Sequence, residues 1–208
     1  MSLDLLLVRH GQTDWNVIRR VMGHNPIALN DVGKKQAGDL KNWLCKMEID
    51  AVYSSPMLRA KETAQILVAD RKGLSVIEEP GVAEVHYGDW VGLTFEEVRK
   101  QHGKIFSDYH SNASGVQIPG GESVKTAQKR AVDAVERMRA THKGQRVVVV
   151  SHADVIKMIL LHYLDMPLDH LQALGCDNGS LSIYRFGTEW GDRLVALNYF
   201  SEADKILS

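Results

Sequence analysis

The sequence of 208 residues lacks the features of several protein classes. It contains only two cysteines, Cys45 and Cys176, which lie far apart and belong to no paired spacing of metal ligands. Reduced thiols are therefore expected, and neither a disulfide framework nor a zinc site. The sequence also has no long apolar segment that could span a membrane, and its N-terminal part lacks the regions of a signal peptide. These absences predict a cytoplasmic protein.

The chain carries no excess of charge of either sign, with 25 Lys and Arg residues against 26 Asp and Glu residues. With so small a net charge, the protein as a whole does not attract nucleic acid or an anionic membrane, so we expect neither as a partner. Any attraction for a phosphorylated ligand has to be local. Because no repeat, linker or low-complexity tract divides the chain, we expect one domain over residues 1–208. The oligomeric state stays open, a dimer included.

An apolar run over residues 5–8 ends in Arg9, His10 and Gly11, and its length and flanking glycine predict a strand buried on both faces. Ligands in open α/β sheets bind beyond the carboxyl ends of the strands, so Arg9 and His10 are expected at such a crevice. A guanidinium binds phosphate oxygens and a neutral imidazole can act as a nucleophile. The pair therefore suggests phosphoryl transfer onto His10, with a solvated turn as the plainer alternative for the tripeptide alone.

A second apolar run, residues 147–150, predicts another buried strand that leads through His152 into a helix over residues 155–164. The N-terminus of a helix attracts anions through its free amides. A lone histidine at such a place is more often a packing or capping residue. Two histidines at equivalent strand ends favour a joint role.

The strand expected over residues 51–53 is followed by Ser55 and Pro56, which predict the N-cap and the first residue of a helix. Arg59 then falls in or just after the first turn, near the sheet edge where His10 is expected. An arginine on a helix is usually solvated, because arginine is seldom buried. Its place after a strand end and a helix start favours the site instead.

The loop over residues 84–92 places Glu84 close to aromatic and ionisable residues, a composition typical of a site, although a surface carboxylate is the alternative. Residues 103–122 show no clear period and predict a long structureless surface connection that serves as a lid. A polar end that frays is expected over residues 201–208. Other helices are expected from Asn30, over residues 95–101 and from Ser123 to Gly144, and other strands over residues 76–77, 181–185 and 194–199.

Taken together, these pieces resemble the histidine phosphatase superfamily, the phosphoglycerate mutase-like proteins, over almost the whole chain. The resemblance implies an α/β fold, a three-layer α/β/α sandwich with a mostly parallel sheet. The matching residues, in chain order, are Arg9 to Thr13 with Asn16, Gly23, residues 33–37, residues 54–56 with Arg59, Ala60, Thr63 and Ala64, Glu84 with Gly88, Trp90 and Gly92, residues 121–123, and residues 150–152.

The resemblance implies that His10 is the nucleophile that becomes phosphorylated and that Glu84 donates a proton to the leaving oxygen. Arg9, Arg59 and His152 are implied as the cationic cradle of the phosphoryl group, and Asn16 as a further donor. With two arginines and an imidazolium supplying the charge, no metal and no other cofactor is expected. Residues implied on the substrate side are Gln12, Thr13, Gly23, His86, Tyr87 and Ala153. Ala153 replaces a glycine usual in the family, and Asp154 adds a negative charge near the pocket.

The family includes phosphatases, which pass the phosphoryl group to water, and mutases, which pass it to a second hydroxyl. Residues 84–88 are closer to the mutase form of the loop, and residues 88–92 to the phosphatase form. The expected lid contains no arginine and only Lys104, so a substrate carboxylate would be left uncompensated. Hydrolysis of a small phosphorylated metabolite is therefore favoured, with a phosphoglycerate mutase as the alternative. A phospholigand-binding module is a third candidate, disfavoured because binding alone requires neither a nucleophile nor an acid.

Overall fold

The computed structural model describes residues 2–200, so the polar end expected over residues 201–208 lies outside the described part. Its sheet has six strands in the order β3-β2-β4-β1-β5-β6. Neighbouring strands from β3 to β1 run parallel, whereas β5 is antiparallel to β1 and β6 to β5. This arrangement confirms a mostly parallel sheet. The strands are β1 Leu3–Arg9, β2 Ala51–Ser54, β3 Val76–Glu78, β4 Arg146–Ser151, β5 Leu181–Thr188 and β6 Gly191–Tyr199.

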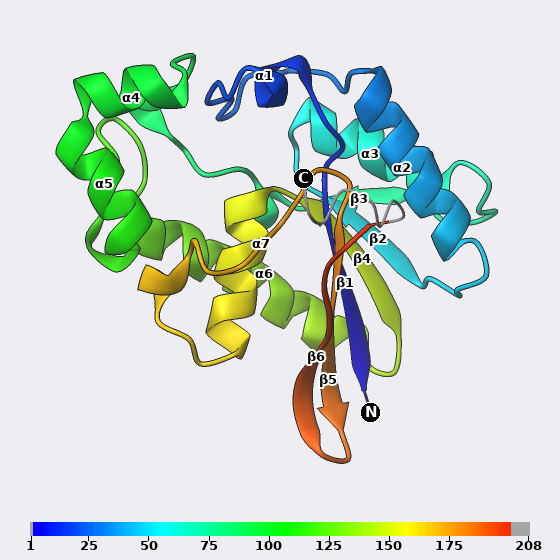
Figure 1. Ribbon diagram of the computed structural model, residues 1–208. Helices are drawn as coiled ribbons and strands as arrows, with labels where there is room; N and C mark the ends of the chain where they lie inside the picture. Colours follow the sequence, from blue (N-terminus) through cyan, green and yellow to red (C-terminus); the bar gives the residue numbers. More distant parts are fainter. Residues whose placement is uncertain (1, 201–208) are drawn as a thin grey trace.

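Helices cover both faces of the sheet, with α2 and α3 on one face and α6 and α7 on the other (Figure 1). The helices are α1 Asp14–Val17, α2 Asp31–Leu44, α3 Leu58–Val68, α4 Phe95–Gln101, α5 Gly103–Ser111, α6 Val124–Thr141 and α7 Ala153–Tyr163. Short 3-10 turns lie at Pro80–Val82, Gly88–Trp90, Ala113–Gly115 and Leu168–His170. The three-layer α/β/α prediction is confirmed.

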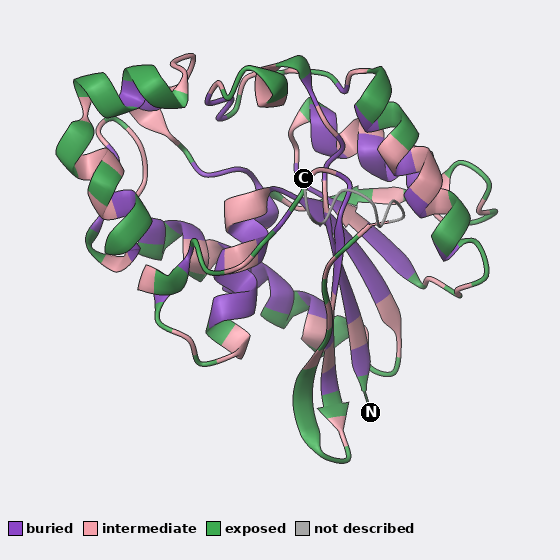
Figure 2. Ribbon diagram, viewed as in Figure 1, coloured by how far each residue is buried: buried purple, intermediate pink, exposed green. Residues whose placement is uncertain are grey.

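The central strand β1 is buried on both faces because its side chains alternate between two cores. Leu5 and Leu7 belong to the core that includes α6 and α7, and Leu6 and Val8 to the core that includes α2 and α3. Figure 2 shows the resulting run of buried residues along the central strands, while β6 at the sheet edge is largely exposed. A continuous apolar run in the sequence is thus the mark of a strand between two helical layers.

The helix start expected at Ser55 and Pro56 is wrong, because α3 begins at Leu58 with Met57 as its N-cap and without a side-chain cap. The Ser55 hydroxyl instead lies 2.7 Å from His152 Nε2 and 3.3 Å from the Met57 amide. The cap-like pattern therefore marks a tertiary contact. The helix starts expected at Asn30 and Ser123 are confirmed, since each of these residues is the N-cap of its helix and its side chain accepts a hydrogen bond from the first turn.

The expectation of a structureless connection over residues 103–122 is also wrong. Its first half forms the helix α5, in which Tyr109 lies one turn after Ile105 and Phe106, and all three pack in the larger core. An ion pair between Lys104 and Asp108, 2.7 Å long, supports the same helix on its outer side. Three apolar positions in so short a segment gave too weak a period to be recognised.

Two glycines bring the turn after β1 against the start of α2. A Cβ atom on Gly11 would lie 2.3 Å from the Gly33 carbonyl oxygen, and one on Gly33 would lie 2.1 Å from the Gln12 carbonyl oxygen. Both obstacles are backbone atoms, which cannot rotate away. The absence of side chains here therefore sets where His10 lies relative to α2.

We expect Gly33→Ala to lower the free energy of unfolding by about 1 to 3 kcal/mol, the usual cost of overpacking. The matched control is Gly38→Ala in the same helix, where a Cβ atom meets nothing within 4 Å. That change should raise the free energy of unfolding by about 0.5 to 1 kcal/mol, because alanine favours a helix interior. Urea denaturation of both variants measures the two effects, and an equal response would show that the close approach does not constrain the turn.

Candidate active site

His10 lies at the carboxyl end of β1 and is 1% exposed. Its Nδ1 donates to the Gly11 carbonyl oxygen at 2.7 Å, and its Nε2 accepts from Arg59 Nε at 3.3 Å. Burial lowers the pKa of His10 well below its ordinary value, and the charges of Arg59 and Arg9 lower it further. The ring is therefore neutral near pH 7, with the proton on Nδ1 and the lone pair of Nε2 on the side of Arg59.

Arg59, in the first turn of α3, is fully buried. Its Nη2 donates to the Gly23 carbonyl oxygen at 3.0 Å and lies 3.5 Å from Glu84 Oε2, while its Nη1 donates to the Asn25 carbonyl oxygen at 3.4 Å. These contacts hold the guanidinium against His10. The alternative of a solvated helix residue is excluded.

Two buried nitrogen atoms beside His10 have no hydrogen-bond partner within residues 2–200: Arg9 Nε and His152 Nδ1. Arg9 is held through its Nη1, which donates to the Cys176 carbonyl oxygen at 2.7 Å. The His152 ring lies 5.2 Å from the His10 ring, centroid to centroid. A buried donor without an acceptor is costly, so these two atoms indicate a ligand rich in acceptor oxygens.

The contacts of Ser55 favour one tautomer of His152. Because the Ser55 hydroxyl oxygen accepts from the Met57 amide, its hydrogen is available to donate to His152 Nε2. The ring hydrogen then resides on Nδ1, where it can serve as a donor. Burial and the nearby charge of Arg59 lower the pKa of His152 well below its ordinary value. The expected imidazolium is therefore a neutral ring in this structure.

Glu84 lies in the loop after β3 and is 8% exposed. Its Oε1 accepts from the Val85 amide at 2.9 Å, and its Oε2 lies 3.4 Å from His152 Nδ1 without hydrogen-bond geometry. Burial raises the pKa of Glu84, Arg59 opposes this effect, and the charge of Asp154 raises the pKa further. The sequence alone leaves open whether the pKa of Glu84 is raised or lowered, whereas the arrangement in the structure raises it.

Asn16 has a fixed side-chain orientation. Its Oδ1 accepts from the Thr13 amide at 3.0 Å and from Asn178 Nδ2 at 3.3 Å, which leaves Nδ2 as the donor. Asn178, in the turn before β5, also donates to the His10 carbonyl oxygen at 3.2 Å. Sequence reasoning missed Asn178, since nothing in its local sequence connects it with a strand end more than 160 residues away.

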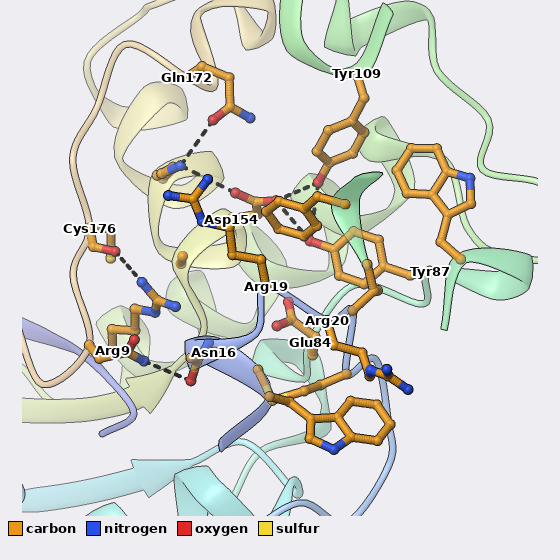
Figure 3. Close-up of a pocket in the computed structure, with 18 of the residues that line it drawn as sticks. Arg9, Asn16, Arg19, Arg20, Glu84, Tyr87, Tyr109, Asp154, Gln172 and Cys176 are labelled. Atoms are coloured by element: carbon orange, nitrogen blue, oxygen red, sulfur yellow. Dashed lines mark hydrogen bonds and ion pairs between the residues drawn. The ribbon is translucent and has the colours of Figure 1, made fainter. Parts of the chain in front are cut away.

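A cavity of about 480 Å³ opens above these residues (Figure 3). Arg9, His10, Asn16 and Glu84 line its inner part, while Arg59 and His152 are fully buried beneath. This volume suits a small metabolite. The remaining lining residues include Trp15, Arg19, Arg20, Tyr87, Phe95, Phe106, Tyr109, His110, Ala153, Asp154, Lys157, Gln172, Asp177 and Asn178.

The structure separates the residues expected on the substrate side into two groups. Tyr87 and Ala153 line the cavity. Gln12, Thr13, Gly23 and His86 do not, although Gly23 contacts Arg59 beneath the cavity. Thr13 caps α1, the Gly23 carbonyl oxygen accepts from Arg59, the Gln12 amide donates to Gln36, and the His86 amide donates to Glu122.

Asp154 joins α5 to the wall of the cavity. Its Oδ2 accepts from the hydroxyls of Tyr87 at 2.8 Å and Tyr109 at 2.6 Å, and its Oδ1 lies 3.4 Å from Lys157 Nζ (Figure 3). The negative charge suggested by the sequence is therefore present in the pocket, held by two hydroxyls and one ammonium group.

Within residues 2–200, no cluster of three or more His, Cys, Asp or Glu side chains is arranged to hold a metal ion. No helix in the same range is long and apolar enough to cross a membrane.

Comparison with known proteins agrees with this geometry. The family model described as the histidine phosphatase superfamily (branch 1) matches residues 5–199. Phosphoserine phosphatase 1 of Hydrogenobacter thermophilus is 35% identical over 181 residues, which cover 87% of this chain and 85% of that protein. Phosphoglycerate mutase-like protein 4 of Arabidopsis thaliana is 40% identical over 158 residues, 75% of this chain and 69% of that protein. The solved structure of YhfR from Bacillus stearothermophilus superposes with a TM-score of 0.89 at 30% identity, covering 96% of this chain and 98% of that one.

Proposed function

The chain belongs to the histidine phosphatase superfamily, and we propose that it hydrolyses small phosphomonoesters by way of a phosphohistidine on His10. Phosphatase activity is supported by the relatives and solved structures named as phosphatases, and the mutase alternative is less favoured. One observation carries the proposed mechanism. The neutral, buried His10 presents its Nε2 lone pair beside two buried donors, Arg9 Nε and His152 Nδ1, that have no acceptor within residues 2–200.

In the first step, His10 Nε2 attacks the phosphorus atom, the N–P bond forms, and the bond from phosphorus to the leaving oxygen breaks. Arg9, Arg59, Asn16 Nδ2 and His152 Nδ1 donate to the phosphoryl oxygens, whose charge they stabilise. Glu84 gives its proton to the leaving oxygen as that bond breaks.

In the second step, a water molecule attacks the phosphorus atom of the phosphohistidine. The Glu84 carboxylate accepts the water proton, the N–P bond breaks, and phosphate leaves with His10 neutral again. The raised pKa of Glu84 suits both roles, because the group has to be protonated first and basic afterwards. A pure binding module needs neither property.

The expectation that a lid poor in basic residues would leave a substrate carboxylate uncompensated is wrong. Although residues 103–122 supply only Lys104, the cavity receives cations from other elements: Arg19 and Arg20 follow α1, and Lys157 lies on α7. A substrate carboxylate would therefore not be left uncompensated. Hydrolysis is supported instead by the relatives and solved structures that are named as phosphatases.

Two finer proposals accompany this function. Both cysteines are free, which is typical of the reducing cytoplasm, so we place the protein there. We also propose that α5 is the lid, because Phe106 and Tyr109 line the cavity from that helix.

Phosphate release from a panel of phosphorylated metabolites, including O-phosphoserine and 3-phosphoglycerate, tests the function. We expect turnover that is unchanged by EDTA, because the site supplies its positive charge from arginines. Exchange between 2- and 3-phosphoglycerate without net phosphate release would indicate a mutase. Tight binding by calorimetry with neither reaction would indicate a binding module.

A further inference from the structure

We propose that Arg19 and Lys157 form a second anion-binding position in the cavity, so that the preferred substrate carries another oxyanion, a carboxylate or a second phosphate, besides the phosphoryl group that is cleaved. This inference rests on the proposed phosphatase function and narrows its substrate class.

Arg19 enters the cavity from the segment after α1. In Figure 3 its side chain extends toward Asp154 on α7. Within residues 2–200 its guanidinium has no hydrogen-bond or ion-pair partner. Its φ of 51° is left-handed, a conformation that residues other than glycine seldom adopt. Backbone hydrogen bonds to Asn16 and from Phe95 hold this conformation, so the cation is directed by the fold.

Lys157 contributes the second cation from the opposite element, α7. Its side chain is only 12% exposed, yet its contacts to Asp154 Oδ1 and Gln172 Oε1 are both 3.4 Å long. Asp154 shares its charge with the hydroxyls of Tyr87 and Tyr109. A largely buried ammonium group with two long contacts is incompletely satisfied, and an anionic ligand group would complete its shell.

The charge balance of the whole site supports the same conclusion. With Glu84 protonated as the acid, five cations stand against two carboxylates, a net charge of +3. A phosphomonoester dianion neutralises two of these charges. One positive charge then remains for another anionic group. The five cations are Arg9, Arg19, Arg20, Arg59 and Lys157, and the carboxylates are Asp154 and Asp177.

Matched substrate pairs test the inference. O-phosphoserine and O-phosphoethanolamine differ only by a carboxylate, and propane-1,3-diol bisphosphate and its monophosphate differ only by a second phosphate. We expect the native protein to prefer the more anionic member of at least one pair by tenfold or more in kcat/KM, mainly through KM. The pair that shows the preference identifies which oxyanion is bound.

Arg19→Met and Lys157→Met should each reduce that preference by about tenfold, roughly one charge-assisted contact. The control is Arg193→Met, which removes an exposed arginine on β6 outside the cavity and should keep the native preference. Circular dichroism verifies the fold of each variant.

Equal turnover of both members of both pairs by the native protein would overturn the inference and leave the phosphatase function intact. A native-like preference in both cavity variants would also overturn it. Failure to release phosphate from any of the four compounds, or from the wider panel, would remove the proposed function and this inference with it.

Discussion

His10→Ala is expected to lower kcat/KM by about 10⁴-fold or more and to abolish the phosphoenzyme, because no other group in residues 2–200 presents a comparable nucleophile to the phosphoryl site. Serine and cysteine are poor candidates. The Ser55 hydroxyl is engaged by His152 and the Met57 amide, and burial raises the pKa of the Cys176 thiol. Within residues 2–200, only His10 presents the lone pair of a neutral ring nitrogen among the phosphate-binding donors, with Arg59 Nε as its one partner.

Rapid quench of the native protein with ³²P-labelled substrate should trap an adduct that is labile in acid and stable in base, as expected of a phosphohistidine. The matched control is His170→Ala, an exposed histidine outside the cavity, which should retain both the adduct and turnover. Peptide mapping that located the label on Ser54, Ser55 or a cysteine would contradict the assignment, and so would an undiminished adduct in His10→Ala.

The place of His10 and His152 could be predicted from the sequence because it depends on local patterns. Two apolar runs too short for helices, residues 5–8 and 147–150, are each followed by a histidine two positions later. Parallel strands bring their carboxyl ends to one edge, and β1 and β4 are indeed neighbours, with Arg9 opposite Ser151. The apolar runs therefore identify the buried strands, and the ends of these strands identify the sheet edge at which both histidines lie.

The role of Ser55 could not be predicted, because a serine before a proline has the same local pattern whether it caps a helix or contacts a distant side chain. The contact with His152 exists because β2 pairs with β4, which aligns Ser54 with Val150. The anion-binding position formed by Arg19 and Lys157 could not be predicted from the sequence for the same reason. Arg19 and Lys157 belong to segments that share no local pattern, and only the folded chain brings them to one cavity.

Glu84→Gln is expected to lower kcat/KM for alkyl phosphates by about 10² to 10⁴-fold, the usual contribution of a general acid, and to affect p-nitrophenyl phosphate far less. An alkoxide is a poor leaving group and requires a proton as the bond breaks, whereas p-nitrophenolate departs as an anion. Burial and the charge of Asp154 raise the pKa of Glu84 against the opposing charges of Arg59 and Arg9. The group therefore stays protonated to a higher pH than a solvated carboxyl.

The pH dependence gives this prediction a second measurement. Since the protonated form is required, kcat/KM for an alkyl phosphate should fall as the pH rises through the raised pKa of Glu84, and this limb should be absent from the Glu84→Gln profile. Burial lowers the pKa of His10, so its deprotonation should not limit the rate near neutrality. If the variant keeps its circular dichroism spectrum but loses both substrates by the same factor, Glu84 positions Arg59 and does not act as an acid, because loss of a positioning group would impair every leaving group alike.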